Sequence, residues 1–294
     1  MNIRGATPYI LLTGFLFLLN SAQAVTNTPA HTYPCGMDVA LKIGHDLVAT
    51  LDPKFRNLLS PEAISVEQSA VPIVTSVEAN RHGYLRQISV STGFVNLLNH
   101  IAHAKAIDHI QPGYFNHYVA ALARQHARET PIQPADLDNP IYWTDPVMQE
   151  QVNFFNQMVS ITLALNLSHL YLDHYDKYAV KMTEGRSSPV NYFIGSDEWQ
   201  ASVKYATLNS LDCALPTEGA EALFDCIDRL PRHPTWADYI LPQTVNIKKL
   251  NKQLADYEHD YYFGRPSLLH PRRSLTLVEG KDASSPQSLA QLSN

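Results

Sequence analysis

The chain has 294 residues and carries 28 acidic side chains against 22 basic ones, a formal net charge of −6 with the histidines neutral. Its composition, 45% hydrophobic and 17% charged, excludes collagen-like, coiled-coil and wholly disordered chains. The acidic balance and the lack of a basic run argue against nucleic acid or an anionic membrane as the main partner.

The first 24 residues are predicted to be a cleaved signal peptide. Arg4 supplies the positive charge, residues 9–19 are apolar, and Ala22-Gln23-Ala24 is a typical cleavage site. The apolar segment is too short for a bilayer, which needs ~20 residues, so an uncleaved anchor is the lesser alternative. We expect export to the periplasm or the extracellular space, with no stable membrane anchor after processing.

The predicted secondary structure is mostly helical. Two short β-branched-rich segments, 71–77 and 85–90, are expected to be strands. The stretch from Pro146 to Met182 has no further Pro or Gly, which predicts one long buried helix or two abutting helices. The other expected helices span residues 37–51, 94–110, 114–128, 197–211, 219–230 and 245–257.

The fold class expected from this pattern is α+β, mostly helical. Residues 25–265 are predicted to form a single domain, and residues 266–294 a disordered tail. Three cysteines, Cys35, Cys213 and Cys226, remain after processing. Export permits one structural disulfide, but an odd number leaves a thiol over and the pairing stays open.

Histidines are the most promising chemical groups in the chain. His100 and His103 stand three apart on one expected helix, where they could chelate a metal, although histidines at the edge of a core are commoner. His169 and His174 are five apart, about 140° around a helix, and are expected not to bind one ion together. His169 shares its helix face with Asp173 and Asp176.

Four segments follow one another in an order found in a known family. Residues 88–95 read I-S-V-S-T-G-F-V, residues 165–169 L-N-L-S-H, residues 198–202 E-W-Q-A-S and residues 230–234 L-P-R-H-P. In this order the chain resembles the HtpX and CaaX-prenyl-protease family of zinc metallopeptidases, whose helix motif is H-E-x-x-H and whose next helix carries E-[FW]-Q-A-D.

The resemblance implies a zincin-like core, in which a small sheet packs on a long central helix. It implies zinc ligands at His169 and Glu198, with Glu198 approaching from a following helix. A helical insertion is expected at about 108–158, and it carries three histidines that could serve as substitute ligands, as could His100 or His103: His109, His117 and His126.

The chain departs from the family at the positions that carry the chemistry. Leu165 stands where the first zinc histidine would be, and Asn166 where the general-base glutamate would be. Asn has no carboxylate to take a proton, and two ligands fall short of the three that hold catalytic zinc. Ser202 replaces the acidic residue that ends the E-[FW]-Q-A-D motif. His169 and Glu198 are therefore interpreted as a remnant metal site from which zinc has been lost.

Three functions follow as hypotheses. The favoured one is a non-catalytic relative, a pseudopeptidase that binds a protein or peptide partner by strand addition along Ile88–Ser91. The first alternative is an active zinc-dependent endopeptidase whose metal site is rebuilt from His169, Glu198 and a histidine elsewhere. The second is an unrelated exported helical protein whose histidines are structural.

Overall fold

The structure is a computed structural model that describes residues 31–78, 86–125, 130–178, 189–231, 233–242 and 245–264. The predicted signal peptide and C-terminal tail lie outside these residues. The helices and strands, in chain order, are α1 (Met37–Thr50), α2 (Pro53–Arg56), β1 (Leu59–Glu67), β2 (Val74–Glu78), β3 (Arg86–Ser91), α3 (Thr92–Ile110), α4 (Tyr114–Leu122), η1 (Pro140–Trp143), α5 (Asp145–Tyr171), α6 (His174–Lys177), η2 (Val190–Tyr192), α8 (Ser196–Asp212), α9 (Glu218–Asp228), α10 (Thr235–Asp238) and α11 (Ile247–Phe263).

The predicted α+β class is confirmed: helices predominate and the described strands form one three-stranded sheet of order β1-β3-β2. The two predicted strands correspond to β2 and β3, which pair antiparallel. The sequence analysis missed β1, which runs parallel to β3. β1 contains Pro61 and Glu62, residues depleted in strands, and its register is irregular between Leu59 and Ile64.

Strand addition along Ile88–Ser91 requires β3 to be an edge strand, but β3 is the central strand of the described sheet. Ile88, Ser89 and Val90 are paired with β1 on one side and with β2 on the other. The backbone groups along Ile88–Ser91 are therefore engaged within the protein, and a partner strand cannot be added there without displacing a neighbour. The prediction of this segment as an edge is wrong, because β1 was not recognised.

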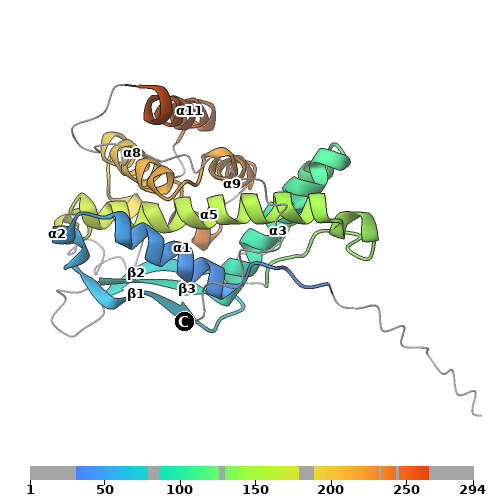
Figure 1. The fold of residues 1–294 in the computed structure, drawn as a ribbon, viewed down its shortest axis with the longest axis horizontal. Helices are drawn as coiled ribbons and strands as arrows, with labels where there is room; N and C mark the ends of the chain where they lie inside the picture. Colours follow the sequence, from blue (N-terminus) through green and yellow to red (C-terminus); the bar gives the residue numbers. More distant parts are fainter. Residues whose placement is uncertain are drawn as a thin grey trace, which may run out of the picture. The chain divides into compact units, whose positions relative to one another are not determined.

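Helix α5 runs through the middle of the described fold, with α8, α9 and α11 on one side and α1 and the sheet on the other (Figure 1). Its residues from Phe154 to His169 are buried on nearly every face. A helix buried all round needs no polar stripe, which explains the apolar sequence of this segment. At Gly44 in α1 a Cβ would lie 2.7 Å from Ile64 of β1 and 3.3 Å from Leu163 of α5. Helix α1 thus packs between sheet and central helix.

The turn from β3 into α3 is held by Ser91 and Gly93. The Ser91 hydroxyl accepts hydrogen bonds from the backbone N–H groups of Phe94 and Ile73 and donates one to the carbonyl of Val71. A Cβ on Gly93 would lie 2.2 Å from the carbonyl oxygen of Ala70. Only glycine permits this approach, so the glycine of the motif at residues 88–95 has a packing role.

The stretch 146–182, expected to be one long helix or two abutting helices, holds two described helices: α5 stops at Tyr171 and α6 begins at His174. Residues 179–182 lie outside the described residues. Between α5 and α6, Asp173 adopts a left-handed conformation, with φ of 60°. Aspartate tolerates this conformation better than most residues, so the chain turns here without a glycine.

The cysteines form no disulfide with one another, and Cys35 and Cys226 are buried. In the part of the chain that the structure describes, no helix is long and apolar enough to cross a membrane.

Candidate functional site

His169 lies at the end of α5 and contacts a second histidine. Its side chain is 1% exposed, and its Nδ1 lies 3.1 Å from Nδ1 of His174 and 3.2 Å from the Ser202 hydroxyl. The expectation that the two histidines point apart assumed a continuous helix. Because the chain turns at Asp173, His174 folds back onto His169 instead.

Both histidines are held neutral by their surroundings. Burial, and after it the nearby His174, lower the pKa of His169 to about 3, and the Asn191 side chain opposes part of this shift. Burial also lowers the pKa of His174. A hydrogen bond between the two Nδ1 atoms requires that one of them carries a hydrogen, so the tautomers of the two rings are coupled. We call His169, His174 and Ser202 the histidine cluster.

Glu198 is the N3 residue of α8, and its carboxylate is already engaged. It accepts hydrogen bonds from Lys177 Nζ, from the Tyr178 hydroxyl at 2.8 Å and from the backbone N–H of Gly195 at 3.0 Å. These partners, Lys177 first, lower the pKa of Glu198 to about 2. Helix α8 meets His169 through Ser202, whose hydroxyl also lies 3.1 Å from the Glu198 carbonyl oxygen.

Leu165 and Asn166 have structural roles. Leu165 is 1% exposed and belongs to the hydrophobic core. Asn166 donates a hydrogen bond to the carbonyl of Thr162 at 3.0 Å and accepts one from the Tyr175 hydroxyl at 3.3 Å. The residue in the general-base position is thus a buried amide that ties α6 to α5.

The other candidate histidines have their own environments. His103 donates from Nε2 to the carbonyl of Tyr142 at 2.8 Å, and burial lowers its pKa. His100 is buried beside it, and burial lowers its pKa to about 4. His109 pairs with Glu150 at 3.0 Å. The remaining two are His117, which is exposed, and His126, which lies outside the described residues.

The arrangement does not fit a catalytic zinc ion. Such an ion takes three protein ligands, and no group of three His, Cys, Asp or Glu side chains gathers suitably among the described residues. The Lys177 ammonium sits on the Glu198 carboxylate, where it would repel a cation. Asp176, the acid expected to share a face with His169, pairs with Arg86 at 3.3 Å instead.

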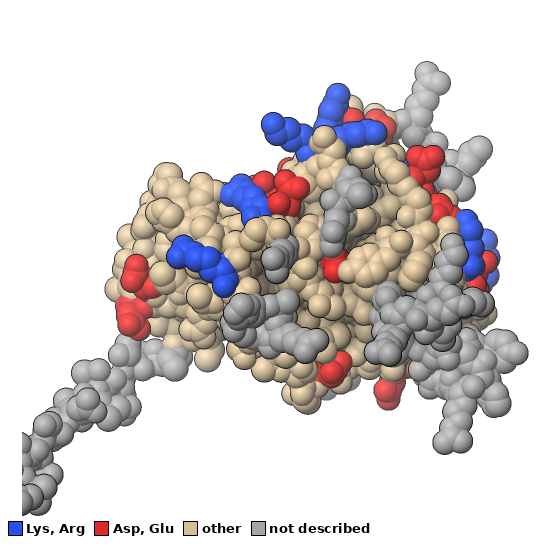
Figure 2. All heavy atoms as spheres, turned by 180° about the vertical axis from the view of Figure 1, so that it is seen from behind, with Lys and Arg blue, Asp and Glu red and all other residues tan. Residues whose placement is uncertain are grey.

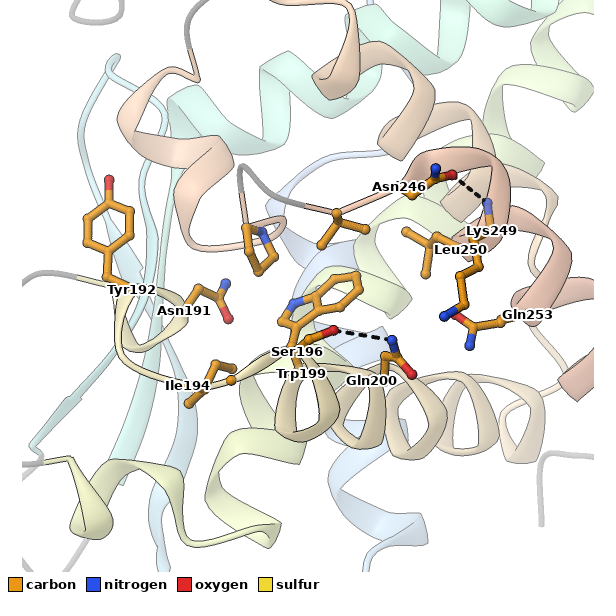
Figure 3. Close-up of a pocket in the computed structure, with 13 residues that line it drawn as sticks. Asn191, Tyr192, Ile194, Ser196, Trp199, Gln200, Asn246, Lys249, Leu250 and Gln253 are labelled. Carbon is orange, nitrogen blue, oxygen red and sulfur yellow. Dashed lines mark hydrogen bonds between the residues drawn. The ribbon is translucent and has the colours of Figure 1, made fainter.

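A cleft of about 490 Å³ lies on another face of α8 (Figure 3). This volume is within the ~300–1,000 Å³ range of ligand pockets. Its walls come from the segment leading into α8 and from the first turns of α11. They consist of Asn191, Tyr192, Ile194, Gly195, Ser196, Trp199, Gln200, Pro242, Val245, Asn246, Lys249, Leu250 and Gln253. The sequence analysis missed this site, because no motif joins two segments so far apart in the chain.

Trp199 and Asn191 connect the cleft to the protein interior. Trp199 is 3% exposed, and its buried indole Nε1 has no hydrogen-bond partner among the described residues. Asn191 donates to the carbonyl of Asp238 at 3.0 Å, and it is also the residue whose side chain influences His169. The histidine cluster and the cleft therefore share a wall.

Comparison of the chain with protein-family models, with curated proteins and with solved structures found no match. The function is therefore argued from the geometry of the histidine cluster and the cleft.

Proposed function

We propose that the protein is an exported, non-catalytic binding protein that takes a segment of a protein or peptide partner into the cleft beside α8. The observation that carries the proposal is the cleft itself, about 490 Å³ in volume and lined by both apolar and amide side chains. Mixed lining of this kind is typical of ligand sites.

The state of the histidine cluster supports binding without catalysis. A general base must come within hydrogen-bond reach of its substrate, directly or through one water. His169 and Asn166 are 1% and 3% exposed, and Glu198 is occupied by Lys177 and Tyr178. These groups stabilise the junction of α5, α6 and α8.

The relation to zinc metallopeptidases remains part of the proposal and rests on residues 88–95, 165–169 and 198–202. The place of the partner differs from the earlier expectation. Since β3 is paired on both sides, we place the partner in the cleft and no longer along Ile88–Ser91.

The test is to block the cleft and measure peptide binding. Gln200→Trp places a large side chain in the wall, whereas Gln149→Trp makes the same change at an exposed position of α5. A library of fluorescent decapeptides is screened against the mature protein, and the best binder is titrated against both variants. We expect Gln200→Trp to weaken binding at least tenfold and Gln149→Trp to leave it unchanged.

Two outcomes would reject the proposal: no binder in the library, or equal affinities for the two variants. The first of these favours the alternative of a helical protein whose histidines are purely structural.

The other alternative, an active zinc-dependent endopeptidase, is favoured by one observation. The Nδ1 atoms of His169 and His174 are 3.1 Å apart, a separation that two ligands of one metal ion also have. Cleavage of an unfolded protein that is lost with a chelator and in His169→Ala would replace the binding proposal. We expect no such cleavage.

A further inference from the structure

We infer that the cleft takes an acidic peptide, whose carboxylate is bound by Lys249 and the first turn of α11. The inference rests on the proposed function and names its ligand. The argument uses the charge at the start of α11 and the lining of the cleft.

The start of α11 carries positive charge where helices usually carry negative charge. A helix N-terminus has the positive end of the backbone dipole, so acidic residues are favourable there and lysines unfavourable, by ~0.3–1 kcal/mol each. The first turn of α11 holds Lys248 and Lys249 and no acidic residue. The backbone N–H of Lys249 already donates to the Asn246 side chain at 3.0 Å, so a bound anion would interact with the lysine side chains and the helix dipole and not with that N–H.

The lysines of α11 are exposed and available. Lys248, Lys249 and Lys252 are exposed, and none of them makes an ion pair with another described residue. Basic side chains gather at the top of Figure 2, the part of the view in which α11 lies.

The cleft lining is selective for an anion. No Asp or Glu lines it among the described residues, and Lys249 is its one charged side chain. Lys249 and Gln253 extend from α11 toward Gln200 of α8, which places an ammonium group and amide donors around the same space (Figure 3). Carboxylate oxygens accept hydrogen bonds from both kinds of group.

Trp199 places a buried donor in the wall of the cleft. An indole N–H can only donate, and a buried donor without a partner costs ~1–3 kcal/mol. Trp199 Nε1 is such a donor, and it lies on the Asn191 side of the ring in the cleft wall (Figure 3). The nitrogen is covered and faces away from Lys249, so the inference rests on Lys249 and the lining of the cleft.

An acidic peptide fits these features better than a polyanion does. The cleft holds a few side chains at most, and the protein as a whole carries a net charge of −6, which repels a large anion. A single carboxylate on a peptide supplies one negative charge, and the neighbouring peptide atoms can pack on Ile194, Val245 and Leu250.

The test removes the negative charge from the peptide and, separately, the positive charge from the protein. A decapeptide containing Glu that binds the mature protein is titrated together with its Glu→Gln analogue against wild type, Lys249→Met and Lys252→Met. Lys252 is the matched control, because it is an exposed lysine one turn along α11 that does not line the cleft. We expect wild type to prefer the Glu peptide about tenfold and Lys249→Met to lose that preference, with Lys252→Met unchanged.

Equal affinity of wild type for the Glu and Gln peptides would overturn the inference. If Gln200→Trp still blocked binding in that case, the cleft would remain the binding site and only the ligand class would be wrong. Equal losses in Lys249→Met and Lys252→Met would show a diffuse charge effect and would also overturn the assigned site. If no peptide bound at all, the proposed function itself would fail.

Discussion

The histidine cluster and the cleft meet α8 on two of its faces and differ in the groups that surround them. Beside the cluster, Ser202 bonds to His169 and the neighbouring Glu198 is met by Lys177, Tyr178 and a backbone N–H, although the buried Nε2 of His169 has no partner among the described residues. In the cleft, the Trp199 N–H has no partner and Lys249 has no counter-ion among the described residues. Motif-like residues can thus have structural roles, and the exposed ammonium group of Lys249 is the charged group that the cleft offers.

Restoring the metallopeptidase motif in the cluster is expected to cost the most stability. Leu165→His with Asn166→Glu removes a core leucine and buries a carboxylate, so the free energy of unfolding is expected to fall by about 3–5 kcal/mol. Urea unfolding followed by circular dichroism measures it. Gln253→Glu in the cleft is the control, with an expected change below about 0.5 kcal/mol. A double variant as stable as wild type would show that residues 165 and 166 are not tightly packed in the core.

Acid is expected to destabilise the protein through its buried histidines. Burial lowers the folded-state pKa of His169 to about 3 and that of His100 to about 4, below the unfolded value of about 6.5. As the pH falls, the unfolded chain therefore binds protons first. Stability is full above about pH 7 and declines between about 6.5 and 3, by up to ~1.4 kcal/mol per pH unit for each such histidine.

The change of stability with pH is measured from the midpoints of urea unfolding at pH 7, 6 and 5. His169→Gln removes one titrating group and is expected to reduce this change, whereas His259→Gln, at an exposed position of α11, is the control. An unchanged slope in His169→Gln would contradict the neutral, buried state of the cluster.

Ser202→Ala tests the contact between α8 and His169. It removes a buried hydroxyl that lies 3.2 Å from His169 Nδ1, and the expected cost is about 1–2 kcal/mol. Ser196→Ala, in the cleft wall, is expected to change stability by less than about 0.5 kcal/mol. Thermal denaturation of the two variants measures this difference. Equal melting temperatures would contradict a stabilising contact between Ser202 and His169.

The smallest effect is expected for Glu198→Gln. The amide can still accept the hydrogen bond from Gly195 at the start of α8 but loses the charge that meets Lys177, so we expect a loss of about 0.5–1 kcal/mol. Asp197→Asn, at the preceding exposed position, is the control. Melting temperatures in low and high salt separate charge from geometry, because salt weakens only the former.

Much of the secondary structure could be predicted, because long apolar stretches without Pro or Gly have few alternatives to a helix. The predicted helix at 37–51 corresponds to α1, and that at 197–211 to α8. Strand β1 could not be predicted, since Pro61 and Glu62 mask it and its partner is distant in the chain. The sequence left open whether the long apolar stretch is one helix or two, because the turn is made at Asp173 and not at a glycine.

The sites were less predictable than the fold. Glu198 was expected to approach His169 from the following helix, but the residue of α8 that meets His169 is Ser202, and Glu198 pairs with Lys177 instead. The meeting of His169 with His174 depends on the turn at Asp173, which no periodicity reveals. The cleft depends on how the segment before α8 meets α11, and that contact is set by packing of the whole core.

The buried thiols give the folded state a chemical protection of its own. Burial raises the pKa of Cys35 to about 11 and that of Cys226 to about 12. Only thiolates react readily, so both side chains stay unreactive for as long as the fold holds. Once a molecule unfolds, the same thiols become reactive and can be captured as mixed disulfides. The rate at which Cys35 and Cys226 are labelled by a thiol reagent therefore reports the rate of unfolding. Oxidation of these thiols in an unfolded molecule would make that unfolding irreversible.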